Sequence, residues 1–319
     1  MERRTRFLVT ALGTVAAGTI VSELRKYIKD CYILGADIND SATVVSSKDV
    51  DEFYIFPWAI DDKDSYLHFV LSFCGEHNID YLYAVIDEEV ENLSRHRDLF
   101  IAIGTKLCLT DNSTVRTCHF KNLFSVWMEQ NFPGNAIRTY SSSDQILADD
   151  FPLFVKPVEG WASIGCKRID SFPELQSVDM DNCIVQQFIS GDIYVADVIR
   201  SRKTGEMLIS QRKEILRNGN GCGIAVEITD VKEIRSLAEA VAERLNLDGI
   251  ISIEIFCTQQ NELKIIEINP RLPAGTSYSC LVGCNTVVNQ LRIAEGLPLI
   301  TGVNRIGARF ARRYETYEM

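Results

Sequence analysis

The chain has 319 residues, 46% of them hydrophobic, and a formal net charge of −11. This size and composition allow a substantial buried core and predict two or three lobes. The negative charge argues against duplex nucleic acid as the main partner, because binding to phosphates depends on Lys and Arg. The basic stretches "ERRTR" (2–6) and "RIGARFARR" (305–313) are interpreted as solvated termini.

Membrane insertion, secretion and zinc binding are all disfavoured. No apolar run approaches the ~20 residues of a membrane span, and the N-terminal "FLVTAL" is too short and wrongly flanked for a signal peptide. The ten cysteines include no CxxC pair, and the four histidines show neither HxxxH nor HExxH spacing. Dispersed cysteines in a chain of this size are typical of reduced thiols. We therefore expect a soluble, cytoplasmic protein.

The first third of the chain alternates between short apolar runs and amphipathic stretches. Strands are predicted at 6–12, 31–38, 52–57, 81–86 and 106–110. Helices are predicted between them, at 19–28, 65–78 and 88–104. This alternation predicts a doubly wound, mainly parallel sheet, a Rossmann-like α/β domain that we place at residues 1–112.

The turn after the first predicted strand reads "LGTVAAGT" (12–19). Its spacing is GxxxxG without a following Lys, and it is not GxGxxG. Asp37 ends the second strand, where a ribose-binding acid lies in dinucleotide folds. Because the glycine pattern is incomplete, a nucleotide-dependent oxidoreductase is the weaker interpretation. The turn could still offer backbone N–H groups to an anion.

After residue 112 the sequence mixes helices with antiparallel strands. Helices are predicted at 113–135, with Ser113 or Thr114 as the N-cap, and at 230–247. Strands are predicted at 151–157, in two parts within 183–201, and at 206–216, 249–256 and 262–269. The glycine-rich "NGNGCG" (218–223) is predicted to be a mobile loop. This order is typical of an α+β domain, which we place at 113–319.

The last two predicted strands form a hairpin that carries polar side chains on one face. Ser252 and Glu254 share a face of the first strand, and Glu267 and Asn269 share a face of the second. The turn brings Glu254 roughly opposite Glu267. Adjacent carboxylates repel each other, so a divalent cation is the expected partner, and oxygen ligands of this kind suit Mg²⁺ or Mn²⁺. A solvent-facing edge hairpin is the alternative.

Two features upstream of the hairpin fit a nucleotide. Lys156 lies on a predicted strand and precedes a loop that contains Gly160 and Ser163. A lysine combined with backbone amides binds phosphate groups. The extended, apolar "IVQQFI" (184–189) is suited to hydrogen-bonding an adenine through its backbone.

In this order the motifs resemble the ATP-grasp superfamily, over nearly the whole chain. The resemblance is carried by "FKNLFSVWMEQNFP", "LFVKPVEGWASIG", "QQFI", and the pair "ISIEIF" and "IIEINPR". The single-domain carbamoyl-phosphate-synthase-like proteins and the ligase of pyrrolysine biosynthesis look nearest, on "VDEFYIFP" and "EINPRLPAGTS". The resemblance implies a pre-ATP-grasp domain at 1–112 and a two-lobed ATP-grasp domain at 113–319, with a lid lobe at about 148–188.

The resemblance also implies a nucleotide site for ATP with Mg²⁺ or Mn²⁺. Lys121 and Lys156 would contact phosphates, although Phe120 stands where the family usually has Asp. Gln187 and Ile189 would serve adenine through backbone groups, with Gln186 near its amino group. Ile193 stands where relatives often carry the ribose-binding Glu, which makes Asp192 a candidate substitute. The implied metal ligands are Glu254, Glu267 and Asn269, with Arg271 stabilising the transferred phosphoryl group.

The implied reaction is ATP-dependent amide formation between a carboxylate and an amine through an acyl phosphate. The carboxylate would belong to an amino acid or another small molecule. Lys213 and Arg217 are candidates for binding that carboxylate or the γ-phosphate. The acids at 87–89 are expected to cap the following helix rather than to bind an amine. A non-catalytic ATP-binding protein is the other alternative, and the oligomeric state is left open, with a homodimer as one candidate.

Overall fold

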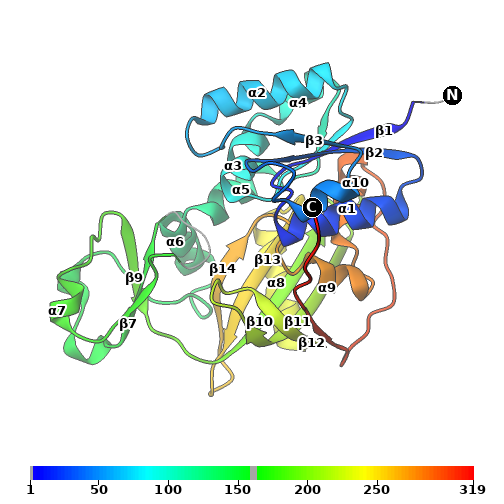
Figure 1. Cartoon of the computed structure of the whole chain (residues 1–319). Helices are drawn as coiled ribbons and strands as arrows, with labels where there is room; N and C mark the ends of the chain where they lie inside the picture. The colour runs from blue at the N-terminus through cyan, green and yellow to red at the C-terminus, as the bar shows by residue number, and fades with distance from the viewer. Residues whose placement is uncertain (1–2, 159–163) are drawn as a thin grey trace.

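The computed structural model describes residues 3–158 and 164–319, and its N-terminal domain is built on a parallel sheet (Figure 1). The sheet has the order β3-β2-β1-β4-β5, and all its pairings are parallel. Its strands are β1 (Thr5–Val9), β2 (Cys31–Asp37), β3 (Glu52–Ile55), β4 (Tyr81–Tyr83) and β5 (Lys106–Leu107). The predicted doubly wound α/β domain is confirmed.

Helices cover both faces of this sheet. One face packs against α1 (Val15–Tyr27) and α10 (Thr286–Glu295). The other packs against α2 (Lys63–Glu76), α3 (Asp87–Arg95) and α4 (Arg97–Ala102). The Tyr83 hydroxyl donates to the Val287 carbonyl at 3.0 Å, so a C-terminal helix is part of the N-terminal domain's core. The 3₁₀ helix η1 (Val45–Asp49) precedes β3.

The central sheet of the second domain is antiparallel and six-stranded, in the order β14-β13-β10-β11-β12-β15. Its strands are β10 (Asp192–Arg200), β11 (Met207–Arg217), β12 (Gly223–Thr229), β13 (Gly249–Cys257), β14 (Leu263–Asn269) and β15 (Arg309–Ala311). The helices α6 (Lys121–Asn131) and α8 (Lys232–Arg244) pack on one face, and the short α9 (Thr276–Leu281) precedes α10. On the opposite face, Ile199 and Ile250 pack into the core that the sheet shares with α10 and the N-terminal domain, and Glu254 lines the functional site.

The helix predicted at 113–135 is two helices, α5 (Asn112–His119) and α6. Phe120 has an extended backbone (φ −87°, ψ 114°), so it ends the first helix and begins the second. The N-cap of α5 is Asp111, whose side chain accepts from the Thr114 N–H, and the predicted cap at Ser113 or Thr114 is wrong. Both hydroxyl residues instead hydrogen-bond to the Asp111 carboxylate.

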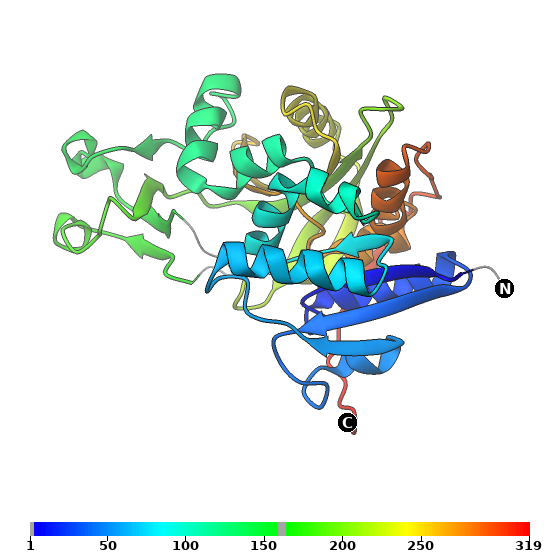
Figure 2. The same ribbon diagram turned by 90° about the horizontal axis from the view of Figure 1, so that it is seen from above.

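A small lobe projects from the rest of the molecule (Figures 1 and 2). Its sheet has the order β6-β9-β7-β8. The elements are β6 (Thr139–Tyr140), η2 (Ser143–Gln145), η3 (Ala148–Asp150), β7 (Leu153–Pro157), β8 (Lys167–Ile169), α7 (Phe172–Leu175) and β9 (Cys183–Gln187). The lobe has an apolar core of its own, and the predicted lid at 148–188 overlaps it. Among the described residues, every helix is too short or too polar to cross a bilayer.

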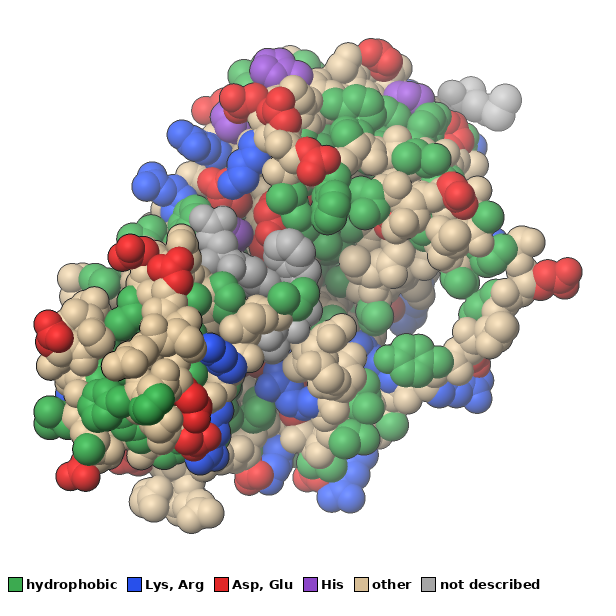
Figure 3. Space-filling model, turned by 60° about the vertical axis from the view of Figure 1, so that its left-hand side comes forward, with side chains coloured by type: hydrophobic (Ala, Val, Ile, Leu, Met, Phe, Trp, Pro, Cys, Tyr) green, Lys and Arg blue, Asp and Glu red, His purple; other side chains and the backbone are tan. Residues whose placement is uncertain are grey.

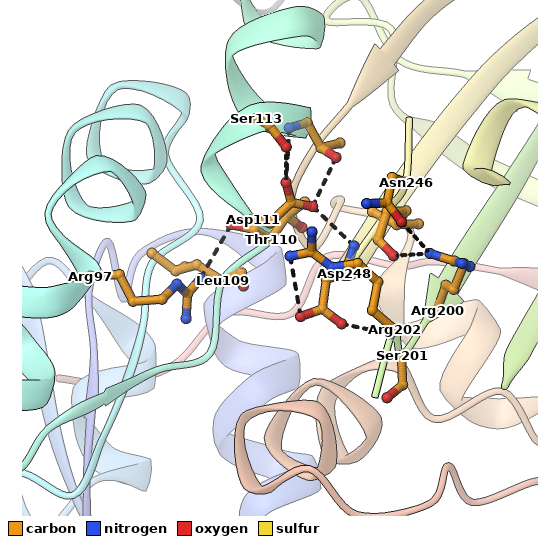
Figure 4. Close-up of polar contacts among 12 residues, drawn as sticks. Arg97, Leu109, Thr110, Asp111, Ser113, Arg200, Ser201, Arg202, Asn246 and Asp248 are labelled. Atoms are coloured by element: carbon orange, nitrogen blue, oxygen red, sulfur yellow. Dashed lines mark hydrogen bonds and ion pairs between the residues drawn. The ribbon is translucent and has the colours of Figure 1, made fainter. Parts of the chain in front are cut away.

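A polar junction connects the two domains where the chain leaves β5 (Figure 4). Arg97 of α4 donates to the Thr110 carbonyl at 3.3 Å. The Asp111 N–H donates to the Asp248 carbonyl at 3.0 Å, and the Asp248 N–H returns a hydrogen bond to the Asp111 carboxylate at 2.9 Å. The Thr110 hydroxyl donates to the Ile250 carbonyl at 2.6 Å. The segment between the domains is therefore tied at several points to the start of β13.

Replacing Asp111 tests this junction. Asp111→Ala removes a helix cap and the acceptor of the Asp248 N–H. We expect the free energy of unfolding to fall by about 1–3 kcal/mol, the combined range for a lost cap and an unpaired buried donor. Ser113→Ala removes only one hydroxyl donor and should cost less than about 1 kcal/mol. Urea denaturation measures both, and an equal or larger loss in Ser113→Ala would contradict the assignment of Asp111 as the cap.

Candidate active site

A cavity of about 1120 Å³ is lined by residues of the N-terminal domain, the small lobe and the six-stranded sheet. Figure 3 looks onto the side where the small lobe approaches the N-terminal domain, and hydrophobic side chains gather there on the N-terminal domain. The loops after β1, β2 and β3 contribute one side of the cavity. Ligands of open parallel sheets bind at this edge, outside the carboxyl ends of the strands.

The predicted carboxylate pair lies in this cavity. The antiparallel register of β13 and β14 pairs Glu254 with Glu267 and Ser252 with Asn269. The Asn269 amide donates to the Glu267 carboxylate at 3.2 Å. Burial, and then the charge of Glu267, raise the pKa of Glu254 to about 7. The alignment expected from strand alternation is confirmed, and the carboxylates face the cavity rather than open solvent.

The chemistry of this pair fits a divalent cation. Two carboxylates on adjacent strands repel each other in a buried setting, and Glu254 already recruits a cation, since Arg217 donates to it at 2.7 Å. Glu254, Glu267 and Asn269 would hold the ion. The described residues contain no group of three or more His, Cys, Asp and Glu that could hold a metal, so this site offers two carboxylates and one amide. Mg²⁺ is commonly held in this way, by one or two carboxylates and substrate phosphates.

Arg271 makes a bidentate ion pair with a residue of the N-terminal domain. Its Nε and Nη2 donate to the two oxygens of Asp87 at 2.6 and 2.8 Å. Burial alone would raise the pKa of Asp87, but Arg271, with help from His119 and Lys121, lowers it below its ordinary value. The guanidinium predicted to meet the phosphoryl group is therefore held at the cavity wall by a carboxylate that the sequence motif does not contain.

The two predicted phosphate lysines both line the cavity. Lys156 is 7% exposed, and its ammonium lies 3.5 Å from the Ile266 carbonyl. Burial lowers the pKa of Lys156, which Glu267 partly offsets, and Lys121 is close enough to lower it further. A buried cation near two carboxylates suits a ligand that carries its own negative charge and metal ion.

The predicted adenine contacts lie on β9 and the residues after it, and all three line the cavity. The Gln186 side chain donates to the Thr139 hydroxyl at 2.9 Å. The Gln187 N–H donates to the Arg138 carbonyl. Of the two backbone groups of Gln187, only the carbonyl could then hydrogen-bond to an adenine. Ile189 follows the end of the strand. The phosphate-loop residues Gly160 and Ser163 lie outside the described residues.

Lys213 and Asp192 are not brought to the cavity. They form an ion pair with each other at 2.6 Å, and neither is among the residues that line it. Regular alternation would put Lys213 and Arg217 on the same face of β11. A register irregularity between Glu214 and Arg217 shifts the phase, so Arg217 faces the cavity while Lys213 faces away from it. A bulge of this kind leaves no clear mark in one sequence.

The acids at 87–89 have three different environments, although all lie in the first turn of α3, where capping was predicted. Asp87 pairs with Arg271. Glu89 accepts hydrogen bonds from the hydroxyls of Thr10 and Tyr66. Glu88 lines the cavity and makes no hydrogen bond or ion pair within the part of the chain that the structure describes. The three acids lie in the first turn of the helix, as predicted, but the main contact of Asp87 is its ion pair with Arg271.

The turn after β1 is closed by the acid that a dinucleotide fold would use for ribose. The Asp37 carboxylate accepts from the Gly13 N–H at 2.8 Å and from the Asn39 side chain at 2.9 Å. A Cβ at Gly13 would lie 3.2 Å from the same carboxylate. Asp37 is therefore engaged in holding the turn, which weakens the oxidoreductase alternative.

Family models match most of the chain. Residues 121–275 match the model of the ATP-grasp domain, and residues 7–108 match the model of the PylC-like, N-terminal domain. The chain belongs to the ATP-grasp superfamily. This agrees with the fold and with the resemblance inferred from the sequence motifs.

Curated relatives are similar over part of their length. The formate-dependent phosphoribosylglycinamide formyltransferase of Bacteroides fragilis is 26% identical over 178 residues, 50% of this chain and 45% of that protein. The D-alanine–D-alanine ligase of Oceanobacillus iheyensis is 25% identical over 147 residues, 40% of each chain. The chain thus spans less than half the length of these relatives.

Solved structures share the whole fold. The biotin carboxylase domain of the Hydrogenobacter thermophilus 2-oxoglutarate carboxylase, crystallised with MgADP and bicarbonate, has a TM-score of 0.76 at 14% identity and covers 97% of this chain and 74% of that chain. The L-amino acid ligase of Bacillus licheniformis has a TM-score of 0.68 at 17% identity, covering 92% and 75%. At these identities the likeness establishes the fold.

Glu89 makes the stability of the N-terminal domain depend on pH. Burial raises the pKa of Glu89 to about 7 from an ordinary value of 4.5. The folded chain therefore retains a proton that the unfolded chain releases, and this stabilisation is lost as pH rises from 4.5 to about 7. The loss amounts to about 3 kcal/mol, at about 1.4 kcal/mol per pKa unit.

Glu89→Gln removes this titration. We expect its free energy of unfolding to change less than that of the wild type between pH 5 and 8, with a difference of up to about 3 kcal/mol. Denaturant titrations at several pH values measure the two profiles. Parallel profiles would show that Glu89 does not titrate differently in the folded chain.

Proposed function

We propose that this protein is an ATP-dependent carboxylate–amine ligase that forms an amide through an acyl phosphate. The observation that carries the proposal is the carboxylate pair Glu254 and Glu267, placed side by side in a large cavity that Lys121 and Lys156 also line. This arrangement suits the triphosphate of ATP with Mg²⁺, which would neutralise the two carboxylates and provide an oxygen-rich site.

The proposed reaction has two steps. A carboxylate oxygen of the acyl donor attacks the γ-phosphorus of ATP, the bond from phosphorus to the bridging oxygen breaks, and ADP leaves. The amine nitrogen then attacks the acyl carbon, the bond from carbon to the phosphate oxygen breaks, and inorganic phosphate leaves as the nitrogen loses a proton to solvent. No side-chain nucleophile is needed. The residues position the reactants and stabilise the charge that develops.

The distribution of charge supports separate places for the reactants. Lys121, Lys156, Arg217 and Arg271 line the cavity on the ATP-grasp domain, where phosphates would lie. Among the described lining residues from the N-terminal domain there is no Lys, Arg or His, and Glu88 is an acid that makes no hydrogen bond or ion pair there. The exposed Trp58 also lines this side. An amine substrate suits that surface better than an anion does.

Catalysis is favoured over a purely ATP-binding role. A protein that only bound nucleotide would not need a second, acidic compartment joined to the phosphate region. The missing ribose Glu is the feature that fits a non-catalytic relative. Asp192, its candidate substitute, pairs with Lys213 outside the cavity, so ribose recognition has to use other residues of the site.

ADP release tests the proposal. With Mg²⁺-ATP, hydroxylamine as the amine and a panel of small carboxylates and amino acids, we expect at least one acid to stimulate ADP release and to give a hydroxamate. Glu267→Gln should lower that rate by about 10²–10³-fold, the typical effect of removing one group that stabilises transition-state charge. Omitting Mg²⁺ should have a similar effect.

Glu262→Gln is the matched control for this substitution. Its side chain is 63% exposed near the far end of the same hairpin, so its rate should equal that of the wild type. If no acid stimulates ADP release, or if Glu267→Gln is as active as the wild type, the ligase proposal is wrong.

A further inference from the structure

One face of the small lobe's sheet carries a row of three residues on neighbouring strands. The register pairs Thr139 of β6 with Gln186 of β9, and Gln186 with Phe154 of β7. Directly opposed residues of antiparallel strands share a face of the sheet. Gln186 and Phe154 line the cavity, and so does Lys156, two residues further along β7. Lys156 and Gln186 are therefore diagonal neighbours on one face, roughly 7–8 Å apart between Cα atoms.

The wall of the cavity beside Gln186 is apolar and aromatic. Phe154, Ile184 and Phe188 line it, and the rings of Phe154 and Phe188 lie 6.3 Å apart between their centroids. Aromatic side chains of this kind suit a flat ring. Because Lys156 lies close by, the wall is well placed for the base of a nucleotide whose phosphates reach that lysine. Gln186 adds a polar side chain to this wall, although the residue is only 6% exposed.

The direction of the Gln186 amide is set by Thr139. A hydroxyl group has one hydrogen to donate, and the Thr139 hydroxyl donates it to the Ile137 carbonyl at 3.1 Å. Toward Gln186 this hydroxyl can then only accept, and it accepts from the Gln186 Nε2 at 2.9 Å. An amide turned end for end would place its carbonyl oxygen against the hydroxyl oxygen with no proton between them. The amide is therefore held with its nitrogen toward Thr139.

This direction leaves the oxygen of the amide without a partner. Within residues 3–158 and 164–319, the Gln186 Oε1 accepts no hydrogen bond, although the side chain is buried and lines the cavity. Leaving a buried acceptor without a donor is costly. The oxygen therefore points to a ligand that brings an N–H or O–H group to this part of the wall.

We propose that Thr139 is a positioning residue that controls the choice of purine base, because it holds the Gln186 Oε1 ready to accept from an amino group at C6. Adenine carries such an amino group. Hypoxanthine and guanine carry an oxygen at C6, which would face the Gln186 oxygen with no proton between the two. Thr139 is not among the described residues that line the cavity, so it acts on the base only through the direction of the amide.

This inference rests on the proposed use of ATP and concerns how the site selects its base. The competing explanation is structural: the hydrogen bond between Thr139 and Gln186 would only help to join β6 to β9. Loss of the Thr139 hydroxyl would then weaken the binding of adenine and hypoxanthine nucleotides alike. The positioning role predicts opposite changes for the two bases, because a freed amide can turn and offer its N–H groups to an oxygen at C6.

Direct binding of nucleoside diphosphates separates the two explanations without any turnover. Isothermal titration calorimetry with Mg²⁺ gives the Kd values of ADP and of inosine diphosphate (IDP), which carries hypoxanthine. We expect the wild type to bind ADP about 100-fold more tightly than IDP, since IDP leaves two acceptors unpaired. Thr139→Val keeps the shape of the side chain and removes the hydroxyl. In this variant we expect the Kd of ADP to rise, the Kd of IDP to fall, and the preference to drop by about tenfold.

Three further variants make the test specific to the direction of the amide. Thr139→Ser keeps a hydroxyl and should keep the wild-type preference. Ser141→Ala removes another hydroxyl of this lobe that contacts a glutamine, Gln145, but lies outside the cavity, and should change neither Kd. Gln186→Glu has an oxygen at both ends of its head group, so it cannot be turned the wrong way. Adding Thr139→Val to Gln186→Glu should therefore leave the preference of that variant unchanged.

The outcomes distinguish this inference from the proposed function. A Thr139→Val protein that keeps the full preference for ADP, or that binds both nucleotides more weakly by the same factor, would assign Thr139 a structural role and leave the use of ATP standing. A wild type that binds ADP and IDP equally would also overturn the inference. Failure of the wild type to bind ADP at all would refute the ATP-dependent function itself.

Discussion

Two carboxylates lie side by side in a buried setting, and the rest of this site depends on supplying positive charge beside them. Glu254 and Glu267 are paired by the register of β13 and β14, and a slip of one residue would turn one of them into the core. Burial, and then the charge of Glu267, raise the pKa of Glu254, and the ion pair with Arg217 partly offsets this rise. Positive charge must therefore be supplied nearby, and Lys156, together with the proposed metal, supplies it.

The N-terminal domain is an integral part of the site rather than an appendage. Asp87, at the start of α3, holds Arg271 through two hydrogen bonds across the domain boundary. The helix α10, from the end of the chain, packs into the core of the N-terminal domain, and the junction at Thr110 and Asp111 ties the connecting segment to β13.

Local sequence pattern predicted what depends on local periodicity. The parallel sheet followed from alternating strands and helices, and the facing of Glu254 and Glu267 followed from strand alternation and a short turn. These features need only one or two neighbouring elements, and for that reason they could be read from one sequence.

The features that the sequence did not predict have a common physical cause. Each depends on a contact or a backbone distortion that leaves no mark in the pattern of apolar and polar residues. The bulge near the end of β11 puts Arg217 on the cavity face and leaves Lys213 on the other, although regular alternation would put both on one face. The helix break at Phe120 interrupts an amphipathic pattern that otherwise continues. The sequence gives no signal for the buried ion pair of Arg212, because its partner Asp197 lies 15 residues away on a neighbouring strand. Such partners become evident only when the chain is folded.

Transfer of oxygen from the substrate to phosphate tests the central claim most directly. In the proposed reaction, a carboxylate oxygen attacks the γ-phosphorus and leaves with the phosphate when the amine displaces it. An acid labelled with ¹⁸O in both carboxylate oxygens, turned over with ATP and hydroxylamine, should therefore give inorganic phosphate that carries one ¹⁸O atom, as measured by mass spectrometry. Phosphate without label, released at the same rate as ADP, would show that ATP is hydrolysed by water and would contradict the account.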